Sequence, residues 1–366
     1  MEKLARETGL KYDYYRQNFL EKRIKSRMIR LRLTTAQEYL QFITNHPEEI
    51  EKFLNGFTIN VTNFFRNIEV FAKIQSLFLE CANHRKSYFL NRKNAFHSDE
   101  TNDSSNRNIS QDESNKWKYA NELKNYLISS DIQRNRNILE KAKQRDSTKI
   151  NSNLTSSESS LRNTKDLNSL IDQLSMFRKI KRSENGQPKL KIWSCACASG
   201  EEPYSIAILL DQLNNRMPNF PSSEIIASDI DSESLNKAKT GLYGEESMKE
   251  IPQDLIGKYF KRYDGQFGNK YLLSDYIKSK VEFIQEDVIR GHSKPTKYDI
   301  IFCRYFFIYI DRDSRERILR TFEKHLNPGG LLVLGKTETL FNSYKIFKLV
   351  DTKNHIYFKN STYNPD

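Results

Sequence analysis

The first part of the chain is patterned as a set of amphipathic helices. In one stretch, apolar residues recur every three or four positions, at Leu20, Ile24, Met28 and Leu31. This spacing places them on one face of a helix, and the residues between them are mostly Lys and Arg, so the opposite face is cationic. Two further helices are predicted at 36–44 and 47–57. We therefore expect residues 1–78 to form a helical N-terminal domain.

Between about residues 87 and 185 the apolar pattern is lost. This segment is rich in Asn, Ser, Lys and Asp, and large apolar side chains are rare in it. Such a composition buries too little apolar surface to offset the entropy that is lost on ordering. We expect 79–187 to be a polar insertion that is largely disordered, with a transient helix at 117–143 and a more stable helix at 167–180.

After residue 189, short apolar runs alternate with helical patterns. Strands are predicted at 190–194, 224–229, 298–303 and 331–335. Helices are predicted between them, at 204–213, 232–240 and 313–325. This alternation is typical of a doubly wound α/β sheet, which binds ligands at the carboxyl ends of its strands. Hairpin signals also predict a small antiparallel β-subdomain at about 258–283, within a domain that spans 188–366.

The charge of the chain indicates an acidic partner. Its formal net charge is +12, which suits a nucleic acid, an anionic membrane or an acidic protein surface. A general bias toward Lys and Asn accounts equally well for part of this excess. Charge alone therefore does not choose among the partners.

Two kinds of segment are missing from the pattern. No apolar run approaches the roughly 20 residues of a membrane span, and the first residues lack the pattern of a signal peptide, so we expect a cytoplasmic protein.

The four cysteines are Cys81, Cys195, Cys197 and Cys303. Their spacing suits neither a disulfide framework nor a zinc site, so we expect free thiols and no metal.

A loop of small residues follows the first predicted strand, at 194–200. Gly200 is able to take a positive φ angle, and the small side chains let a ligand approach the backbone, as in nucleotide-type sites. Glu201 and Glu202 disfavour a phosphate at the start of the next helix. A cationic ligand such as the methionine part of S-adenosylmethionine suits them better. The loop by itself is also consistent with a plain β–α turn.

Two acidic residues follow the second predicted strand. Asp229 lies about 30 positions beyond the small-residue loop, where an acidic side chain holds ribose hydroxyls in dinucleotide- and adenosyl-binding folds. Asp231 is predicted to cap the next helix, with Glu233 in the first turn of that helix. The pattern therefore favours an adenosyl ligand at this edge of the sheet.

Seven strings resemble, in order, the successive motifs of the CheR chemotaxis methyltransferases. They are FTINVTNFFRN, IWSCACASGEEPYSIAILL, ASDIDSESLNKAKTGLY, YFKRY, FIQEDVI, YDIIFCRYFFIYID and LNPGGLLVLGKTE. The resemblance covers about residues 8–78 and 188–358. It implies a class I S-adenosylmethionine-dependent methyltransferase fold with a small all-α N-terminal domain. It further implies a protein-glutamate O-methyltransferase, which methylates glutamates in the cytoplasmic domain of methyl-accepting chemotaxis receptors and releases S-adenosylhomocysteine. We expect a monomer.

The resemblance also implies which residues bind the cofactor. They are Asn60, Thr62, Arg66, Glu202, Asp229, Asp287, Val288, Cys303 and Arg304. Arg66 would pair with the cofactor carboxylate, Glu202 with its amino acid end, and Asp229 with the ribose hydroxyls. Asp287 and Val288 would contact the edge and face of the adenine.

Catalytic and receptor-binding residues are implied in the same way. Tyr309 corresponds to the family tyrosine that faces the methyl group, and Arg66 would lie beside it. Arg23 and Arg27 align with basic positions that the family uses for receptor contact. Four phenylalanines in the motifs are expected to be core or pocket wall: Phe64, Phe65, Phe306 and Phe307.

Two positions depart from the family pattern. Tyr305 stands where Asn is usual, which alters volume and hydrogen bonding beside the methyl-transfer site. Residues 335–338 read Gly-Lys-Thr-Glu where Gly-His-Ser-Glu is frequent.

Two other functions compete with this one. A nucleic-acid methyltransferase suits the charge, but 304–307 lack an Asn/Asp-Pro-Pro-Tyr/Phe motif, so we expect no nucleic acid partner. A non-catalytic S-adenosylmethionine-binding signalling module is supported by Tyr305 alone.

Overall fold

The computed structural model describes residues 14–55, 62–81, 174, 189–217, 220–265, 268–340 and 346–360. By their contacts, the described residues all belong to one compact unit. The predicted insertion at 79–187 lies outside the described residues, apart from 79–81 and Leu174. The helices predicted at 117–143 and 167–180 lie there as well.

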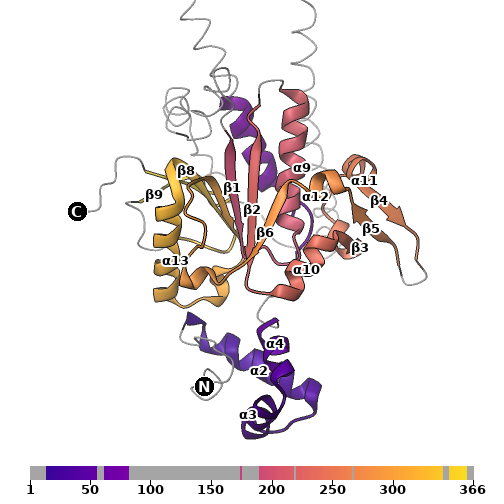
Figure 1. Cartoon of the computed structure of the whole chain (residues 1–366). Helices are drawn as coiled ribbons and strands as arrows, with labels where there is room; N and C mark the ends of the chain where they lie inside the picture. The colour runs from indigo at the N-terminus through magenta and orange to yellow at the C-terminus, as the bar shows by residue number, and fades with distance from the viewer. Residues whose placement is uncertain are drawn as a thin grey trace, which may run out of the picture. The chain divides into compact units, whose positions relative to one another are not determined.

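In residues 14–55, three helices form the described part of the N-terminal helical domain, drawn in indigo in Figure 1. They are α2 (Gln17–Leu31), α3 (Ala36–Asn45) and α4 (Pro47–Asn55). Their core consists of Leu20, Tyr39, Ile43 and Phe53, with Ile24, Met28 and Leu31 packed against it, which confirms the apolar stripe of α2. A capping box starts α3, because Thr35 and Glu38 each accept a hydrogen bond from the other's backbone N–H.

The helix at 68–81 belongs by its packing to the α/β domain. Its buried residues include Val70, Phe71, Ile74 and Phe78, which share a core with Leu190, Ile208 and Ile300. We predicted that the helical domain extends to residue 78, whereas its own core ends with α4. Hydrophobic spacing identifies the apolar face of a helix, but it does not say which domain covers that face.

Seven strands form the main sheet, in the order β6-β2-β1-β7-β8-β10-β9. They are β1 (Leu190–Cys195), β2 (Ser223–Asp229), β6 (Val281–Gln285), β7 (Tyr298–Cys303), β8 (Leu326–Leu334), β9 (Phe347–Asp351) and β10 (Ile356–Lys359). β6, β2, β1, β7 and β8 are parallel, and β10 is antiparallel to both of its neighbours. The doubly wound sheet and its four predicted strands are confirmed.

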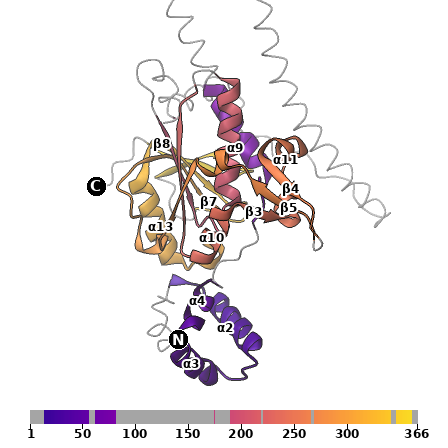
Figure 2. The same ribbon diagram turned by 45° about the vertical axis from the view of Figure 1, so that its right-hand side comes forward.

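Helices cover both faces of this sheet. They include α9 (Glu201–Arg216), α10 (Ser232–Thr240) and α13 (Arg312–His325). In Figures 1 and 2, α9 and α13 lie on opposite sides of the sheet. Neighbouring residues of β1 accordingly enter different cores, Ile192 with α9 and Trp193 with α13. Because both faces are buried, these strands are nearly continuous apolar runs, which made them visible in the sequence.

A smaller antiparallel sheet has the order β3-β5-β4. Its strands are β3 (Leu242–Gly244), β4 (Phe260–Tyr263) and β5 (Lys270–Leu273). They run from 242 to 273, and not over the predicted 258–283, because 281–285 forms β6 at the edge of the main sheet. A three-residue strand such as β3 is too short to show a hydrophobic period.

Short elements complete the fold. They are η2 (Glu245–Met248), α11 (Gln253–Tyr259), α12 (Asp275–Lys278), η3 (Val288–Arg290) and η4 (Phe307–Tyr309). None of the helices in the described ranges is long and apolar enough to cross a bilayer. The strand order reverses at β1, since β2 and β6 lie on one side of it and β7 and β8 on the other. Such a switch point opens a crevice at the carboxyl ends of the strands.

Candidate active site

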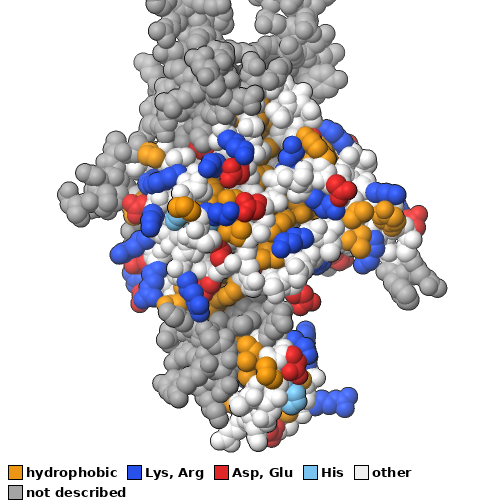
Figure 3. All heavy atoms as spheres, viewed as in Figure 1, with side chains coloured by type: hydrophobic (Ala, Val, Ile, Leu, Met, Phe, Trp, Pro, Cys, Tyr) orange, Lys and Arg blue, Asp and Glu red, His pale blue; other side chains and the backbone are white. Residues whose placement is uncertain are grey.

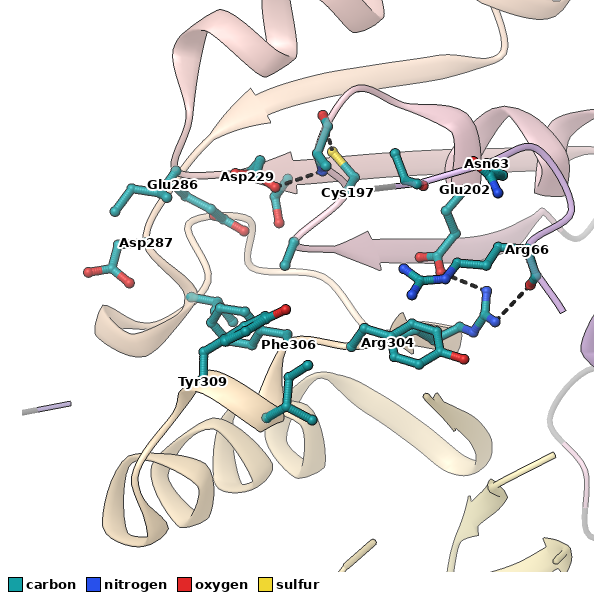
Figure 4. Close-up of a pocket in the computed structure, with 18 of the residues that line it drawn as sticks. Asn63, Arg66, Cys197, Glu202, Asp229, Glu286, Asp287, Arg304, Phe306 and Tyr309 are labelled. Atoms are coloured by element: carbon teal, nitrogen blue, oxygen red, sulfur yellow. Dashed lines mark hydrogen bonds and ion pairs between the residues drawn. The ribbon is translucent and has the colours of Figure 1, made fainter. Parts of the chain in front are cut away.

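A pocket lies at this switch point, at the carboxyl ends of β1, β2, β6 and β7 (Figure 4). Among the residues assigned from the family resemblance, those that line it are Thr62, Arg66, Glu202, Asp229, Asp287, Val288, Arg304 and Tyr309. Cys303 is fully buried beside Cys195 and does not belong to the pocket wall. Asn60 lies outside the described residues.

The small-residue loop forms one wall of the pocket, through Ala196, Cys197 and Ala198. The N–H of Cys197 donates to the carbonyl of Ser228 at 3.0 Å, which ties the loop to β2. Gly200 has a φ of +89°, as predicted, and a Cβ there would lie 2.7 Å from the Cβ of Ala238. No other residue type fits this position without a shift of the backbone or of α10.

Asp229 ends β2 and is almost completely buried. Its carboxylate accepts hydrogen bonds from the N–H of Ala198 at 2.7 Å and of Asp231 at 3.0 Å. Burial raises the pKa of Asp229 to about 6, although these N–H groups oppose the rise. Asp231 caps α10, as predicted, by accepting from the N–H groups of Glu233 and Ser234. The two acids therefore have different roles, and only Asp229 faces the pocket.

A buried ion pair joins the start of α9 to the loop after β7. Glu202 pairs with Arg304 at 3.3 Å through one carboxylate oxygen, and the other accepts from the hydroxyl of Ser194 at 2.8 Å. Burial raises the pKa of Glu202, and the charge of Arg304 opposes that rise. Arg304 also donates through Nη2 to the carbonyl of Arg66 and to Oδ1 of Asn67, both at 2.8 Å.

Glu338 holds the loop that carries Arg304, Tyr305 and Tyr309. Its buried carboxylate accepts from the N–H groups of Tyr305, Phe307 and Gly335 at 2.8, 2.7 and 2.7 Å. In the sequence, residues 335–338 stand out only as a departure from the family pattern, which does not reveal this role of Glu338. An acidic residue just beyond an apolar strand was the available signal.

Two further pocket residues were not anticipated from the sequence. Tyr15 precedes α2 and lines the pocket together with Asp229 and Asp287, and its pKa is raised by burial and by the charges of these two acids. No local pattern marks this tyrosine. Glu286 adjoins Asp287 and accepts from Ser293, and its Oε1 lies 2.7 Å from Nδ1 of His292. The only sign of Glu286 in the sequence is its place next to Asp287, in a motif that resembles the family's.

The predicted receptor arginines have different surroundings. Arg27 forms a bidentate pair with the buried Glu49 at 2.7 and 2.6 Å, and Tyr39 donates to the same carboxylate at 3.1 Å. Arg23 is partly exposed, and its guanidinium lies 5.3 Å from the ring centroid of Phe19. The guanidinium of Arg27 is therefore bound within the helical domain, by Glu49.

The pocket suits a cationic adenosyl ligand. Its acidic residues Glu202, Asp229, Glu286 and Asp287 outnumber its basic residues Arg66 and Arg304. Burial raises the pKa values of Glu202 and Asp229, so added positive charge would favour their ionised forms. S-adenosylmethionine carries a sulfonium and an amino group, and the residues present fit it. The described residues contain no cluster of three metal-ligating side chains.

A doubly wound sheet with this small-residue loop and this buried acid after β2 defines a domain of the S-adenosylmethionine-binding methyltransferase class. The SAM-binding domain of the CheR methyltransferases matches residues 156–356, and their all-alpha domain matches residues 1–58. The chain therefore belongs to the CheR methyltransferase family, and its cofactor is S-adenosylmethionine. The match to the SAM-binding domain begins inside the predicted insertion at 79–187.

Similar proteins include two that are named for chemotaxis. Chemotaxis protein methyltransferase 2 of Vibrio cholerae is 40% identical over 162 residues, which cover 43% of this chain and 54% of that protein. The chemotaxis protein methyltransferase of Salmonella typhimurium is 36% identical over 160 residues, which cover 43% and 55%. The chain thus spans about half the length of these relatives. A solved glycopeptide N-methyltransferase, MtfA complexed with S-adenosylmethionine, is 14% identical with a TM-score of 0.25, over 42% of this chain and 49% of MtfA.

Proposed function

We propose that this protein transfers a methyl group from S-adenosylmethionine to glutamate side chains of a chemotaxis receptor in the cytoplasm. Two of its relatives are named chemotaxis protein methyltransferases, which supports methyl transfer in chemotaxis. One observation about the site carries the proposal. Arg66 and Tyr309 line the same pocket, and the ring of Phe19 packs on that of Tyr309 and lies 5.3 Å from the guanidinium of Arg23. Burial raises the pKa of Tyr309, and the charges of Arg23 and Arg66 oppose that rise. A carboxylate that enters at Tyr309 would meet two cations and a hydrogen-bond donor.

Three elements bring these groups together. Arg23 comes from α2, Arg66 from the segment before the helix at 68–81, and Tyr309 from η4. The backbone supports the arrangement, because the N–H of Arg16 donates to the carbonyl of Tyr309 at 3.0 Å. The rings of Phe19 and Tyr309 pack with their centroids 4.8 Å apart. The start of α2 is thereby joined to a residue of the pocket wall.

The chemistry needs orientation more than it needs a base. When bound, S-adenosylmethionine supplies a methyl group activated by the sulfonium. A glutamate carboxylate is ionised at neutral pH, so its oxygen forms the new O–CH3 bond without losing a proton. Arg66 and Tyr309 would orient this carboxylate in line with the S–CH3 bond that breaks, and the buried pocket would exclude water.

The same proposal assigns the cofactor contacts. Arg66 would pair with the carboxylate of the cofactor and Glu202 with its amino group. Asp229 would accept from the ribose hydroxyls, while Asp287 and Val288 would contact the adenine. All five residues line the one pocket, which supports these roles.

Two further proposals go with this function. We propose that the polar insertion at 79–187 is a separate segment between the two domains. We also propose that the protein is a monomer and acts on the cytoplasmic domain of the receptor. Nucleic acid is not proposed as a substrate. On the face seen in Figure 3, Lys and Arg side chains are scattered among acidic and apolar ones and form no continuous stripe.

A methyl-transfer assay tests the function. The purified protein is incubated with S-adenosylmethionine that carries a radiolabelled methyl group, and with membranes that contain candidate receptors. Label that enters the receptor and is released by mild base, as expected of a methyl ester, supports the proposal. Label in RNA, with none in receptor, would replace it with nucleic-acid methylation. Cofactor binding without transfer to any receptor would indicate a signalling module that binds the cofactor without catalysis.

The two arginines of α2 are predicted to behave differently when changed. Arg23→Ala should raise the KM for receptor and leave cofactor affinity and the melting temperature unchanged, and this effect should shrink as salt screens the contact. Arg27→Ala should lower the free energy of unfolding by about 1.5–3 kcal/mol, because it leaves Glu49 buried without its cation. Kinetics at several salt concentrations and denaturant unfolding measure the two effects.

A surface variant on β9, Lys348→Ala, removes the same charge far from α2 in sequence and serves as the control. An equal rise in KM for Lys348→Ala would show that only net charge matters. A lower kcat in Arg23→Ala, with KM unchanged, would move Arg23 from receptor binding to the methyl-transfer step.

A further inference from the structure

The backbone at Tyr305 adopts a conformation that tyrosine rarely takes. Its φ is +60°, in the left-handed region that favours glycine and asparagine. The conformation is held by Glu338, which accepts from the N–H of Tyr305 at 2.8 Å. Gly335 is also required, since a Cβ there would lie 2.8 Å from the backbone nitrogen of Tyr305. Strain of this kind persists where the surroundings enforce it, and it is frequent at active sites and ligand clamps.

The ring of Tyr305 lies beneath the guanidinium of Arg66. The Cζ atom of Arg66 is 3.7 Å from the ring centroid, which is the distance of a stacked cation–π contact. The hydroxyl of Tyr305 donates to Oδ1 of Asn67, and that oxygen also accepts from Arg304 at 2.8 Å. The ring is thus fixed at both ends, by its strained backbone and by Asn67.

Arg304 binds the backbone of the same residue, Arg66. Its Nη2 donates to the backbone carbonyl of Arg66 at 2.8 Å. Arg66 is therefore held at its carbonyl by Arg304 and at its guanidinium by the ring of Tyr305. Both Arg66 and Tyr305 line the cofactor pocket, so this clamp acts at the ligand.

We propose that Tyr305 is a positioning residue, whose ring holds the guanidinium of Arg66 in the orientation that binds the carboxylate of the cofactor. An arginine side chain loses considerable rotamer freedom when it binds a ligand, and a preformed stack reduces that loss. The inference deepens the proposed function, because it rests on the role of Arg66 at the cofactor. It requires no receptor, so it is testable by binding alone.

The test separates positioning from packing by two measurements, the melting temperature and the affinity for S-adenosylhomocysteine. A positioning residue should affect the affinity without lowering the melting temperature. Tyr305→Asn removes the ring and places a residue that favours the left-handed region, so the melting temperature should be unchanged or higher. Affinity for S-adenosylhomocysteine, measured by calorimetry, should nevertheless fall about 3- to 30-fold, the range expected for a lost cation–π contact. Tyr305→Phe keeps the stack and should bind within about threefold of the native protein, because a neutral hydrogen bond contributes little net.

A double-mutant cycle shows whether Tyr305 acts through Arg66. Arg66→Met alone should weaken binding of S-adenosylhomocysteine, and adding Tyr305→Asn to it should weaken binding no further. If Tyr305→Asn lowers the melting temperature and leaves affinity unchanged, the residue only packs, and the inference fails. A full additional loss in the Arg66→Met background would also overturn it. If Arg66→Met itself leaves affinity unchanged, the proposed role of Arg66 is wrong, and that result is distinct from a failure of Tyr305 alone.

Discussion

Replacing Glu338 by Ala is expected to lower the free energy of unfolding by about 3–5 kcal/mol. The substitution leaves the N–H groups of Tyr305, Phe307 and Gly335 buried without their acceptor. Each unsatisfied buried donor costs about 1–3 kcal/mol, and part of that cost is relieved where the loop relaxes toward water. Unfolding in urea, followed by circular dichroism, measures the loss.

Two variants sharpen this experiment. Glu338→Gln keeps one side-chain oxygen as an acceptor, so it should lose less stability than Glu338→Ala. Glu246→Ala removes an exposed carboxylate and should stay within about 0.5 kcal/mol of the native protein. Because the same loop carries Arg304 and Tyr309, Glu338→Ala should also bind S-adenosylhomocysteine more weakly where it remains folded. A native-like stability for Glu338→Ala would show that the loop holds its shape without this carboxylate.

Replacing Asp229 by Ala is expected to weaken cofactor binding by about 1–3 kcal/mol, or roughly 5- to 150-fold. The loss has two sources. The ribose hydroxyls lose a charged acceptor, and the N–H of Ala198 loses the partner that shapes the loop after β1. Titration calorimetry with S-adenosylhomocysteine measures the change. The neighbouring variant Asp231→Ala removes only the cap of α10, so it should lower stability by about 0.5–2 kcal/mol and leave affinity unchanged.

Binding should also depend on pH through Asp229. Burial raises its pKa to about 6, so its carboxylate becomes protonated as the pH falls through that value. The protonated form cannot accept two N–H bonds and the ribose hydroxyls together, so affinity should fall by about tenfold per pH unit below pH 6. In Asp229→Asn this part of the pH dependence should disappear. An unchanged affinity in Asp229→Ala would remove Asp229 from the site, and an unchanged slope in Asp229→Asn would assign the titration to another group.

Local sequence patterns were sufficient for the elements that hold the pocket. The strands β1 and β7 are buried on both faces, so they appear as apolar runs, and Gly200 provides the positive φ at which the loop after β1 turns into α9. Asp231 was recognised as a helix cap from its spacing alone. These features depend on backbone geometry within a few residues, which the order of residue types records directly.

The tertiary structure alone decided which side chains meet in the pocket. Arg304 binds Asn67 across 237 positions of sequence, and Tyr15 reaches the same cavity from before α2. The sequence placed Arg23 and Arg27 together on one cationic face, whereas the fold turns Arg27 onto the buried Glu49. Periodicity determines the face on which a residue lies. The partner on that face depends on how distant segments pack, and a buried charge takes whichever partner the packing brings within reach.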